Sequence, residues 1–311
     1  MLDPTQQALS QYQQGVALYE TRRYEEALAC FIKAGETDPE YLDAHWNECI
    51  TRLILGDFAA GWPLHEARWQ KNEGRWEADP TKRGWRRLTQ PLWVGDFSIE
   101  GKTVCLWGEQ GFGDTLQFCR YAPMVQAMGA TVFLYVREPI AKLLRQSYAG
   151  MGIAVVADNE PLPPFDVHCP MMSLPLACGT DAVSKIPAPV PYIFAKDEDV
   201  LRWKNRLASH AQQGFEGKKI GLVWSGLMRS TNPAAAKMDA ERSIDFEYLA
   251  PLLSHSQQGL QSIQWFSLQK DIALPDGSGV MDFTPDLHDW ADTAALVANL
   301  DLVISCDTAV A

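Results

Sequence analysis

The pattern of hydrophobic and polar positions changes along this chain. In the first 72 residues, apolar and small side chains recur at helical spacing, which predicts four helices at about 5–20, 24–36, 40–55 and 58–70. From residue 101 onward, short apolar runs alternate with helical patterns, as in a parallel sheet with crossover helices. We therefore expect helical repeats over 1–72, a tryptophan-rich connector over 73–100, and an α/β region after it.

The α/β region divides into two Rossmann-like domains, 101–196 and 197–311. The first has predicted strands at 103–107, 131–136, 153–156, 166–169 and 192–194, and helices at 114–128 and 138–147. The second has predicted strands at 219–224, 263–268, 280–283 and 302–306, and helices near 197–211, 246–253 and 291–298. Because doubly wound domains usually have five or six strands, we expect the second one to be incomplete. The exposed edge beside 301–306 then favours a homo-oligomer.

The helical region carries a repeat signature. Tetratricopeptide positions are matched by Gly15, Leu18, Tyr24, Ala27, Phe31, Ala34 and Pro39. A shift of 34 residues takes Tyr24 to Phe58 and Ala27 to Gly61. Two repeats are fewer than a free-standing array needs, so they are expected to dock on the following domain or on another copy.

Composition and charge argue against several classes of protein to which this chain could belong. The chain has 311 residues, of which 47% are hydrophobic, and a net charge of −12, which argues against a nucleic-acid binder. An anionic small ligand is not excluded, because local charges can outweigh the global field. No segment has the apolar length of a membrane span, and the N-terminus lacks a secretion signal, so a cytoplasmic location is expected. The seven cysteines include no C-x-x-C pair and the histidines are scattered, so we expect neither a metal nor a cofactor.

A glycine-rich turn is the most informative motif. The predicted strand Val104–Trp107 runs into Gly108, Gly111 and Gly113, and Asp114-Thr115 then opens a helical pattern. Strand, glycine turn and helix start together favour an anion or a polar ligand. The spacing differs from the dinucleotide and phosphate-loop motifs, which argues against a nicotinamide dehydrogenase.

The connector allows two interpretations. It mixes basic residues with tryptophans: Lys82, Arg83, Arg86, Arg87, Trp76, Trp85 and Trp93. These residues either form a stacking surface for a base or sugar, or the tryptophans pin the repeats to the next domain. We favour the second interpretation.

Six motifs occur in order along the α/β region. They are Gly108-Glu-Gln-Gly-Phe-Gly-Asp-Thr-Leu-Gln-Phe118, Gly221-Leu-Val-Trp-Ser-Gly226, Arg242-Ser-Ile244, Ser267-Leu-Gln-Lys270, Asp289-Trp-Ala-Asp-Thr-Ala-Ala295 and Asp301-Leu-Val-Ile-Ser-Cys-Asp-Thr-Ala-Val-Ala311. Together with the repeats, they resemble bacterial tetratricopeptide proteins with a GT-B glycosyltransferase-like region. Relatives of that group are the ADP-heptose heptosyltransferases and, more distantly, the O-linked N-acetylglucosamine transferases. In the family the pattern continues beyond Ala311, and the loop between Gly226 and Arg242 is shorter.

The resemblance implies an inverting, metal-independent glycosyltransferase with a nucleotide-sugar donor and a peptide or glycan acceptor. Asp114 would be the catalytic base; alternatively it only caps a helix, which is worth about 1 kcal/mol. Glu109 is either a second carboxylate of the same turn or a hydrogen-bond partner within it. The donor would be bound by Gly111, Gly113, Ser225, Gly226, Arg242, Ser243, Gln269, Lys270, Asp307 and Thr308.

Each donor residue has a simpler alternative. Arg242 has a planar fork that matches phosphate oxygens, with Arg229 a weaker choice, yet either can be a solvated loop charge. Gln269 and Lys270 can be ordinary strand-end residues, and Asp307-Thr308 can be a capping pair. The rival function is a non-catalytic scaffold whose repeats bind a protein partner.

Overall fold

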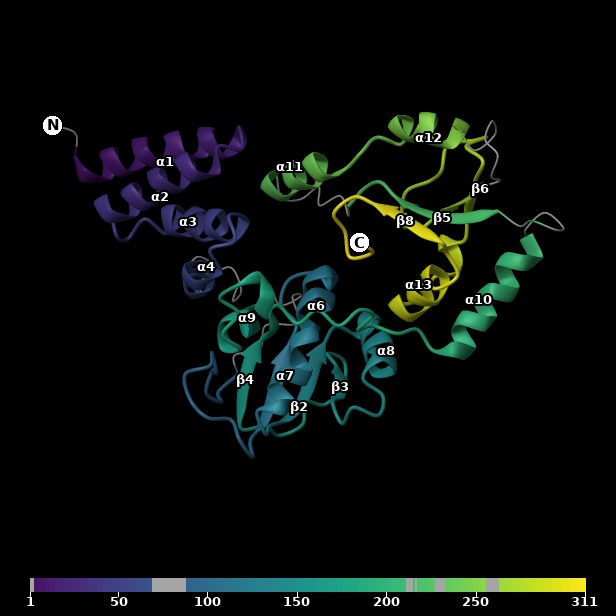
Figure 1. The fold of residues 1–311 in the computed structure, drawn as a ribbon, viewed down its shortest axis with the longest axis horizontal. Coiled ribbons are helices and arrows are strands. Elements are labelled where there is room, and N and C mark those ends of the chain that lie inside the picture. The colour runs from purple at the N-terminus through teal and green to yellow at the C-terminus, as the bar shows by residue number, and fades with distance from the viewer. Residues whose placement is uncertain (1–2, 69–87, 211–214, 216, 227–232, 256–262) are drawn as a thin grey trace. The chain divides into compact units, whose positions relative to one another are not determined.

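The computed structural model describes residues 3–68, 88–210, 215, 217–226, 233–255 and 263–311 (Figure 1). They form two compact units by their internal contacts. The first unit contains residues 1–109, 118–135 and 160–190, and the second contains 110–117, 136–159 and 191–311. Helices at the N-terminus precede two parallel sheets, as the sequence pattern predicts.

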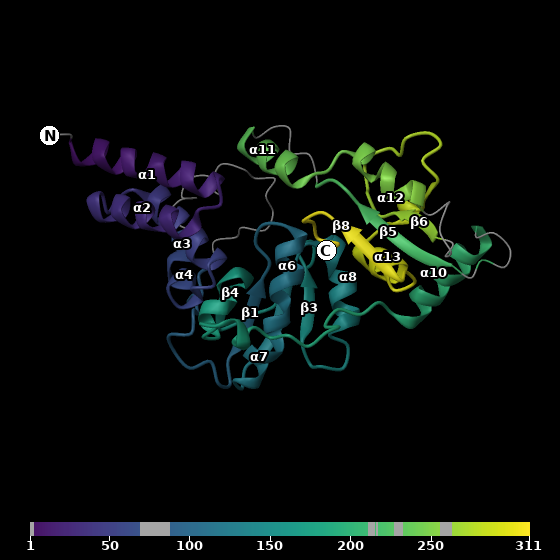
Figure 2. The same cartoon turned by 45° about the horizontal axis from the view of Figure 1, so that its top comes forward.

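Four helices open the first unit: α1 (Pro4–Glu20), α2 (Tyr24–Thr37), α3 (Leu42–Ile54) and α4 (Phe58–His65) (Figure 2). Each packs against the next, and small residues allow the close approach. A Cβ on Gly15 would lie 2.6 Å from the Phe31 ring, and one on Gly61 would lie 2.6 Å from Leu53. Asp57 caps α4 by accepting the Ala60 N–H, as its position predicts.

The first sheet contains β1 (Thr103–Trp107), β2 (Thr131–Val136), β3 (Ala154–Ala157) and β4 (Val167–Pro170), in the order β3-β2-β1-β4. β1 pairs in parallel with β2, with Cys105 opposite Phe133, and with β4, with Cys105 opposite His168. The central residues of β1 are fully buried, which explains its continuous apolar run. The helices and 3₁₀ turns that lie between β1 and residue 190 in the chain are α6 (Phe112–Phe118), η1 (Cys119–Tyr121), α7 (Ala122–Ala127), α8 (Glu138–Ser147), η2 (Met171–Ser173), α9 (Leu174–Ala177) and η3 (Val183–Lys185).

Two predicted elements of this region are wrong. The single helix at 114–128 is divided into α6, η1 and α7, because Pro123 has no N–H to donate and instead occupies the first turn of a new helix. The predicted strand at 192–194 is absent. Phe194 donates its N–H to Ser147 Oγ (2.9 Å) on α8 instead of joining a sheet.

The second sheet contains β5 (Lys218–Val223), β6 (Ile263–Ser267), β7 (Val280–Asp282) and β8 (Leu302–Ser305), in the order β7-β6-β5-β8 and all parallel. α10 (Asp197–His210) and α13 (Trp290–Val297) cover one face, where Trp203 and Leu296 pack against Phe266. η4 (Phe246–Leu249) and α12 (Ala250–His255) cover the other face, so the layers are helix, sheet and helix (Figure 1). The remaining elements are α11 (Pro233–Arg242) and η5 (Thr284–Asp286).

The segment after β8 also differs from expectation. Asp307-Thr308 was predicted to open a helix, yet these residues form a bend that leads into a tight turn. The Thr308 hydroxyl pairs with the Ser305 hydroxyl (3.0 Å), and the Ala311 N–H donates to the Thr308 carbonyl (3.1 Å). Within the described residues, no helix combines the length and the apolar character needed to cross a membrane.

Candidate functional site

The strand order places a switch point in the second sheet. The chain runs from β5 to β6 and β7 on one side, and β8 then pairs with β5 on the other side. In open parallel sheets, ligands gather outside the carboxyl ends of strands where the order reverses. Ser225 and Gly226 follow β5 at this point, and Asp307 and Thr308 follow β8.

The glycine turn that follows β1 lies at the same edge. A Cβ on Gly113 would lie 3.5 Å from the Ala309 Cα, so the two backbones are in close contact. The Phe112 ring packs against Trp290, with centroids 5.6 Å apart, and the Arg137 guanidinium lies 4.3 Å above the Phe112 ring. The predicted donor-site turn at 307–308 and the predicted catalytic turn are therefore neighbours within one unit.

Asp114 occupies the third position of α6, and the helix begins at Phe112. Its Oδ2 accepts the Gly111 N–H at 2.8 Å, and Thr115 Oγ1 donates to the Gly111 carbonyl at 3.2 Å. Gln110, just before, has φ 60°, a left-handed conformation that few non-glycine residues adopt. Asp114 thus closes the turn from inside the helix, in the manner of the carboxylate of a capping box, and not from the N-cap position.

Charges around Asp114 alter its proton affinity. Burial raises the pKa of its carboxyl, and hydrogen bonds from the backbone N–H groups of Gly111 and of Asp114 itself oppose that rise. The negative charge of Asp307 raises the pKa further, whereas Arg242 lowers it, and the net shift is upward. A carboxylate whose pKa is raised toward neutrality is a better proton acceptor than an ordinary surface aspartate.

Arg242, at the end of α11, is held beside this carboxylate. Its Nη2 donates to Asp239 Oδ1 at 2.7 Å, and the Asp239 side chain is fully buried. The guanidinium lies directly on Gly226, where a Cβ would be 2.7 Å from Nε, so a larger residue at this position would require the guanidinium to move. Among the described residues, the buried Nε–H has no hydrogen-bond partner.

Two further predicted donor residues, Gln269 and Lys270, form hydrogen bonds within the second unit. Gln269 is buried, and its Oε1 accepts the N–H groups of Ser225 (2.8 Å) and Trp224 (3.2 Å). Lys270 Nζ donates to the Leu287 carbonyl at 2.8 Å. These contacts match the simpler alternative of strand-end polar residues.

Ser243 links α11 to the β5 edge. Its hydroxyl donates to the Asp239 carbonyl, accepts the Gly226 N–H at 3.2 Å and lies 3.2 Å from Ser225 Oγ. The hydroxyls of Ser225 and Ser243 are therefore engaged with protein atoms. These contacts hold Gly226 in place beside the Arg242 guanidinium.

Sequence reasoning missed a buried ion pair made by Glu109 of the glycine turn. In the first unit, Arg68 donates to Glu109 through Nε (2.9 Å) and Nη2 (2.8 Å). Glu109 is thus a partner of the helical region, which neither alternative of the sequence analysis anticipated. The only signal was an arginine in the last turn of the helix predicted at 58–70, and such residues are usually solvated.

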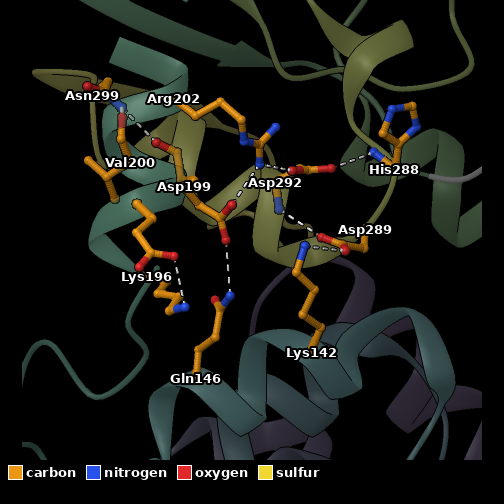
Figure 3. Close-up of polar contacts among 12 residues, drawn as sticks. Lys142, Gln146, Lys196, Asp199, Val200, Arg202, His288, Asp289, Asp292 and Asn299 are labelled. Carbon is orange, nitrogen blue, oxygen red and sulfur yellow. Dashed lines mark hydrogen bonds and ion pairs between the residues drawn. The ribbon is translucent and has the colours of Figure 1, made fainter. Parts of the chain in front are cut away.

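A second polar cluster supports the start of α13 (Figure 3). Arg202 on α10 donates to Asp292 (2.7 Å) and Asp199 (2.9 Å), and Lys142 on α8 pairs with Asp289 (2.9 Å). Asp289 caps α13 by accepting the Asp292 N–H at 2.8 Å. These acidic residues are fully engaged in structural contacts.

Several predicted residues cannot be placed. Lys82, Arg83, Arg86, Arg87, Trp76, Trp85 and Arg229 lie outside the described residues. Trp93 is buried, and its Nε1 donates to the Phe97 carbonyl at 3.0 Å, so its ring is not a stacking surface. Among the residues that the structure describes, no group of three or more His, Cys, Asp or Glu side chains is arranged to hold a metal ion. Comparisons with protein families, with characterised proteins and with solved structures find no match to this chain.

Proposed function

We propose that this chain is a tetratricopeptide-linked glycosyltransferase of GT-B type, which transfers a sugar from a nucleotide donor to an acceptor hydroxyl with inversion. The observation that carries the proposal is the position of Asp114. Its carboxyl, with a raised pKa, lies within electrostatic reach of Arg242 and Asp307 at the switch point of the second sheet.

The proposed chemistry needs a base and a group that stabilises the departing diphosphate. Asp114 accepts the proton of the acceptor hydroxyl as that oxygen attacks the anomeric carbon. The bond from the anomeric carbon to the diphosphate breaks at the opposite side, which inverts the configuration. Arg242 stabilises the developing charge through its guanidinium, and a charge-assisted bond to phosphate is among the strongest of hydrogen bonds.

Two features of the fold support the assignment. Each of the two sheets has four parallel strands in the same relative order, with one switch point each. The N-terminal helices pack through small residues at Gly15 and Gly61, which is how tetratricopeptide helices approach one another. The acceptor is proposed to be a peptide or a glycan.

Calorimetric titration with a panel of nucleoside diphosphates and nucleotide sugars tests this proposal. We expect at least one to bind, and R242Q to weaken that binding tenfold or more. R206Q is the matched control, since Arg206 pairs with Asp286 of η5. Absence of binding by every nucleotide would overturn the proposal, and unchanged binding in R242Q would remove Arg242 from the site. The rival scaffold predicts binding of a protein partner alone.

A further inference from the structure

The buried pair between Arg68 and Glu109 is unusually complete. Both side chains are almost fully buried, with 3% and 1% of their surfaces exposed. Two parallel hydrogen bonds join the guanidinium fork to both carboxylate oxygens. Such a bidentate pair fixes direction as well as distance, unlike a pair of point charges.

The remaining polar atoms of the pair also have partners. Arg68 donates to Glu66 Oε1 (2.6 Å) and to Ser173 Oγ (2.6 Å), and Ser173 in turn donates to Glu66 (2.7 Å). Glu109 accepts the Met172 N–H at 3.2 Å. A buried ionic network is rigid when every member is satisfied. Glu109 is therefore held by the segment after α4 and by the turn after β4.

This network ends at Glu109, inside the glycine turn. Gln110 follows Glu109 directly and adopts φ 60°. A glutamine remains in this conformation only where its surroundings hold it. The next residue, Gly111, donates the N–H that Asp114 accepts at 2.8 Å.

We infer that Arg68, acting through Glu109, is a positioning residue that keeps the Gly111 N–H directed at the Asp114 carboxylate. The inference rests on the proposed function only in naming Asp114 as the base. Burial is the largest influence on the pKa of that carboxyl and raises it. The backbone N–H groups of Gly111 and Asp114 and the charge of Arg242 lower the pKa, and Asp307 raises it. Release of Glu109 removes the Gly111 contribution, so the pKa of Asp114 rises.

The test uses the full chain and two measurements that need no ligand. One is hydrogen exchange at the Gly111 amide. The other is the titration of Asp114 by carboxyl ¹³C NMR, with its signal identified by its loss in D114N. The double variant R68M/E109M replaces both partners with apolar side chains of similar length, so that no buried charge is left unpaired. R52M is the matched control, because Arg52 pairs with Glu48 and Asp57 in the same helical region.

We expect R68M/E109M to speed Gly111 exchange at least tenfold and to raise the pKa of Asp114, whereas R52M changes neither. If the double variant does not fold, E109Q keeps the shape of the side chain and leaves Arg68 paired with Glu66. It should give the same two changes at smaller amplitude. Exchange and titration that match the wild type in a folded variant would overturn the inference. Failure of every nucleotide to bind would count against the proposed function alone, since neither measurement uses one.

Discussion

Two helices of the second unit carry an Asp-Thr pair in their first turn, and the two aspartates differ in their surroundings. Asp114-Thr115 lies in the first turn of α6, and Asp292-Thr293 lies in the first turn of α13. Each aspartate accepts a backbone N–H from a residue before its helix, Gly111 at 2.8 Å and His288 at 3.1 Å. Each threonine hydroxyl donates to a carbonyl four residues earlier, that of Gly111 at 3.2 Å and that of Asp289 at 3.4 Å.

The surroundings separate the two aspartates. Asp292 receives Arg202 at 2.7 Å; burial raises the pKa of its carboxyl, but the bonds from Arg202 and from the His288 N–H outweigh burial, and its pKa is lowered. Asp114 has no ion pair within the part of the chain that the structure describes, and its pKa is raised. The local pattern fixes the helix start, whereas the surroundings decide whether the pKa of the aspartate is lowered or raised.

The largest expected effect is on catalysis. D114N should lower the rate of sugar transfer by about 10²–10⁴-fold, because the amide cannot accept the acceptor proton. The measurement is the steady-state rate with the nucleotide sugar identified by calorimetry. D292N is the matched control and should leave the rate per folded molecule unchanged. Equal loss in the two variants would mean that both aspartates act only on the fold.

The next effect is on stability. D292N should lower the free energy of unfolding by about 1.5–3 kcal/mol, because it removes a charge-assisted hydrogen bond from a carboxylate that is 4% exposed. Urea unfolding followed by tryptophan fluorescence measures the change. K142M breaks the neighbouring ion pair with Asp289, whose partners are 47% and 24% exposed, and should cost under about 1 kcal/mol. A larger loss in K142M than in D292N would contradict this order.

Periodicity predicted most of the architecture because the elements bury continuous apolar faces. β1, β5 and α10 begin and end within a residue or two of expectation. The failures have local causes. Pro123 interrupts one predicted helix, and Phe194 bonds to a helix where a strand was expected.

The candidate site was predicted less completely, since its properties depend on contacts between distant segments. The resemblance assigned Ser225 and Asp307 to one donor site, and the two residues follow the neighbouring strands β5 and β8 of the second sheet. Nothing local showed that Gln269 would satisfy the β5 backbone, or that Arg68 would reach Glu109 across 41 positions of sequence. Long polar side chains have many solvated arrangements, and only the folded chain selects one.

The smallest expected effect has opposite signs at the two helix starts. The folded-state pKa of Asp292 is below its unfolded value, so its stabilising contribution is present above the unfolded pKa and is lost as pH falls through the folded pKa. The folded-state pKa of Asp114 is above its unfolded value, so its contribution is present below the unfolded pKa and is lost as pH rises through the folded one.

D292N should therefore be less stable than the wild type at pH 7, and D114N slightly more stable, since its amide oxygen still accepts the Gly111 N–H. The D114N difference should shrink on acidification toward about pH 4, near the ordinary aspartate pKa, whereas the D292N difference should shrink only below that pH, as pH falls through the folded-state pKa of Asp292. Urea unfolding at several pH values measures them, with the exposed loop variant D276N as control. A D114N protein less stable than the wild type at pH 7 would show that the Asp114 charge stabilises the turn, and the contrast between α6 and α13 would then be one of degree.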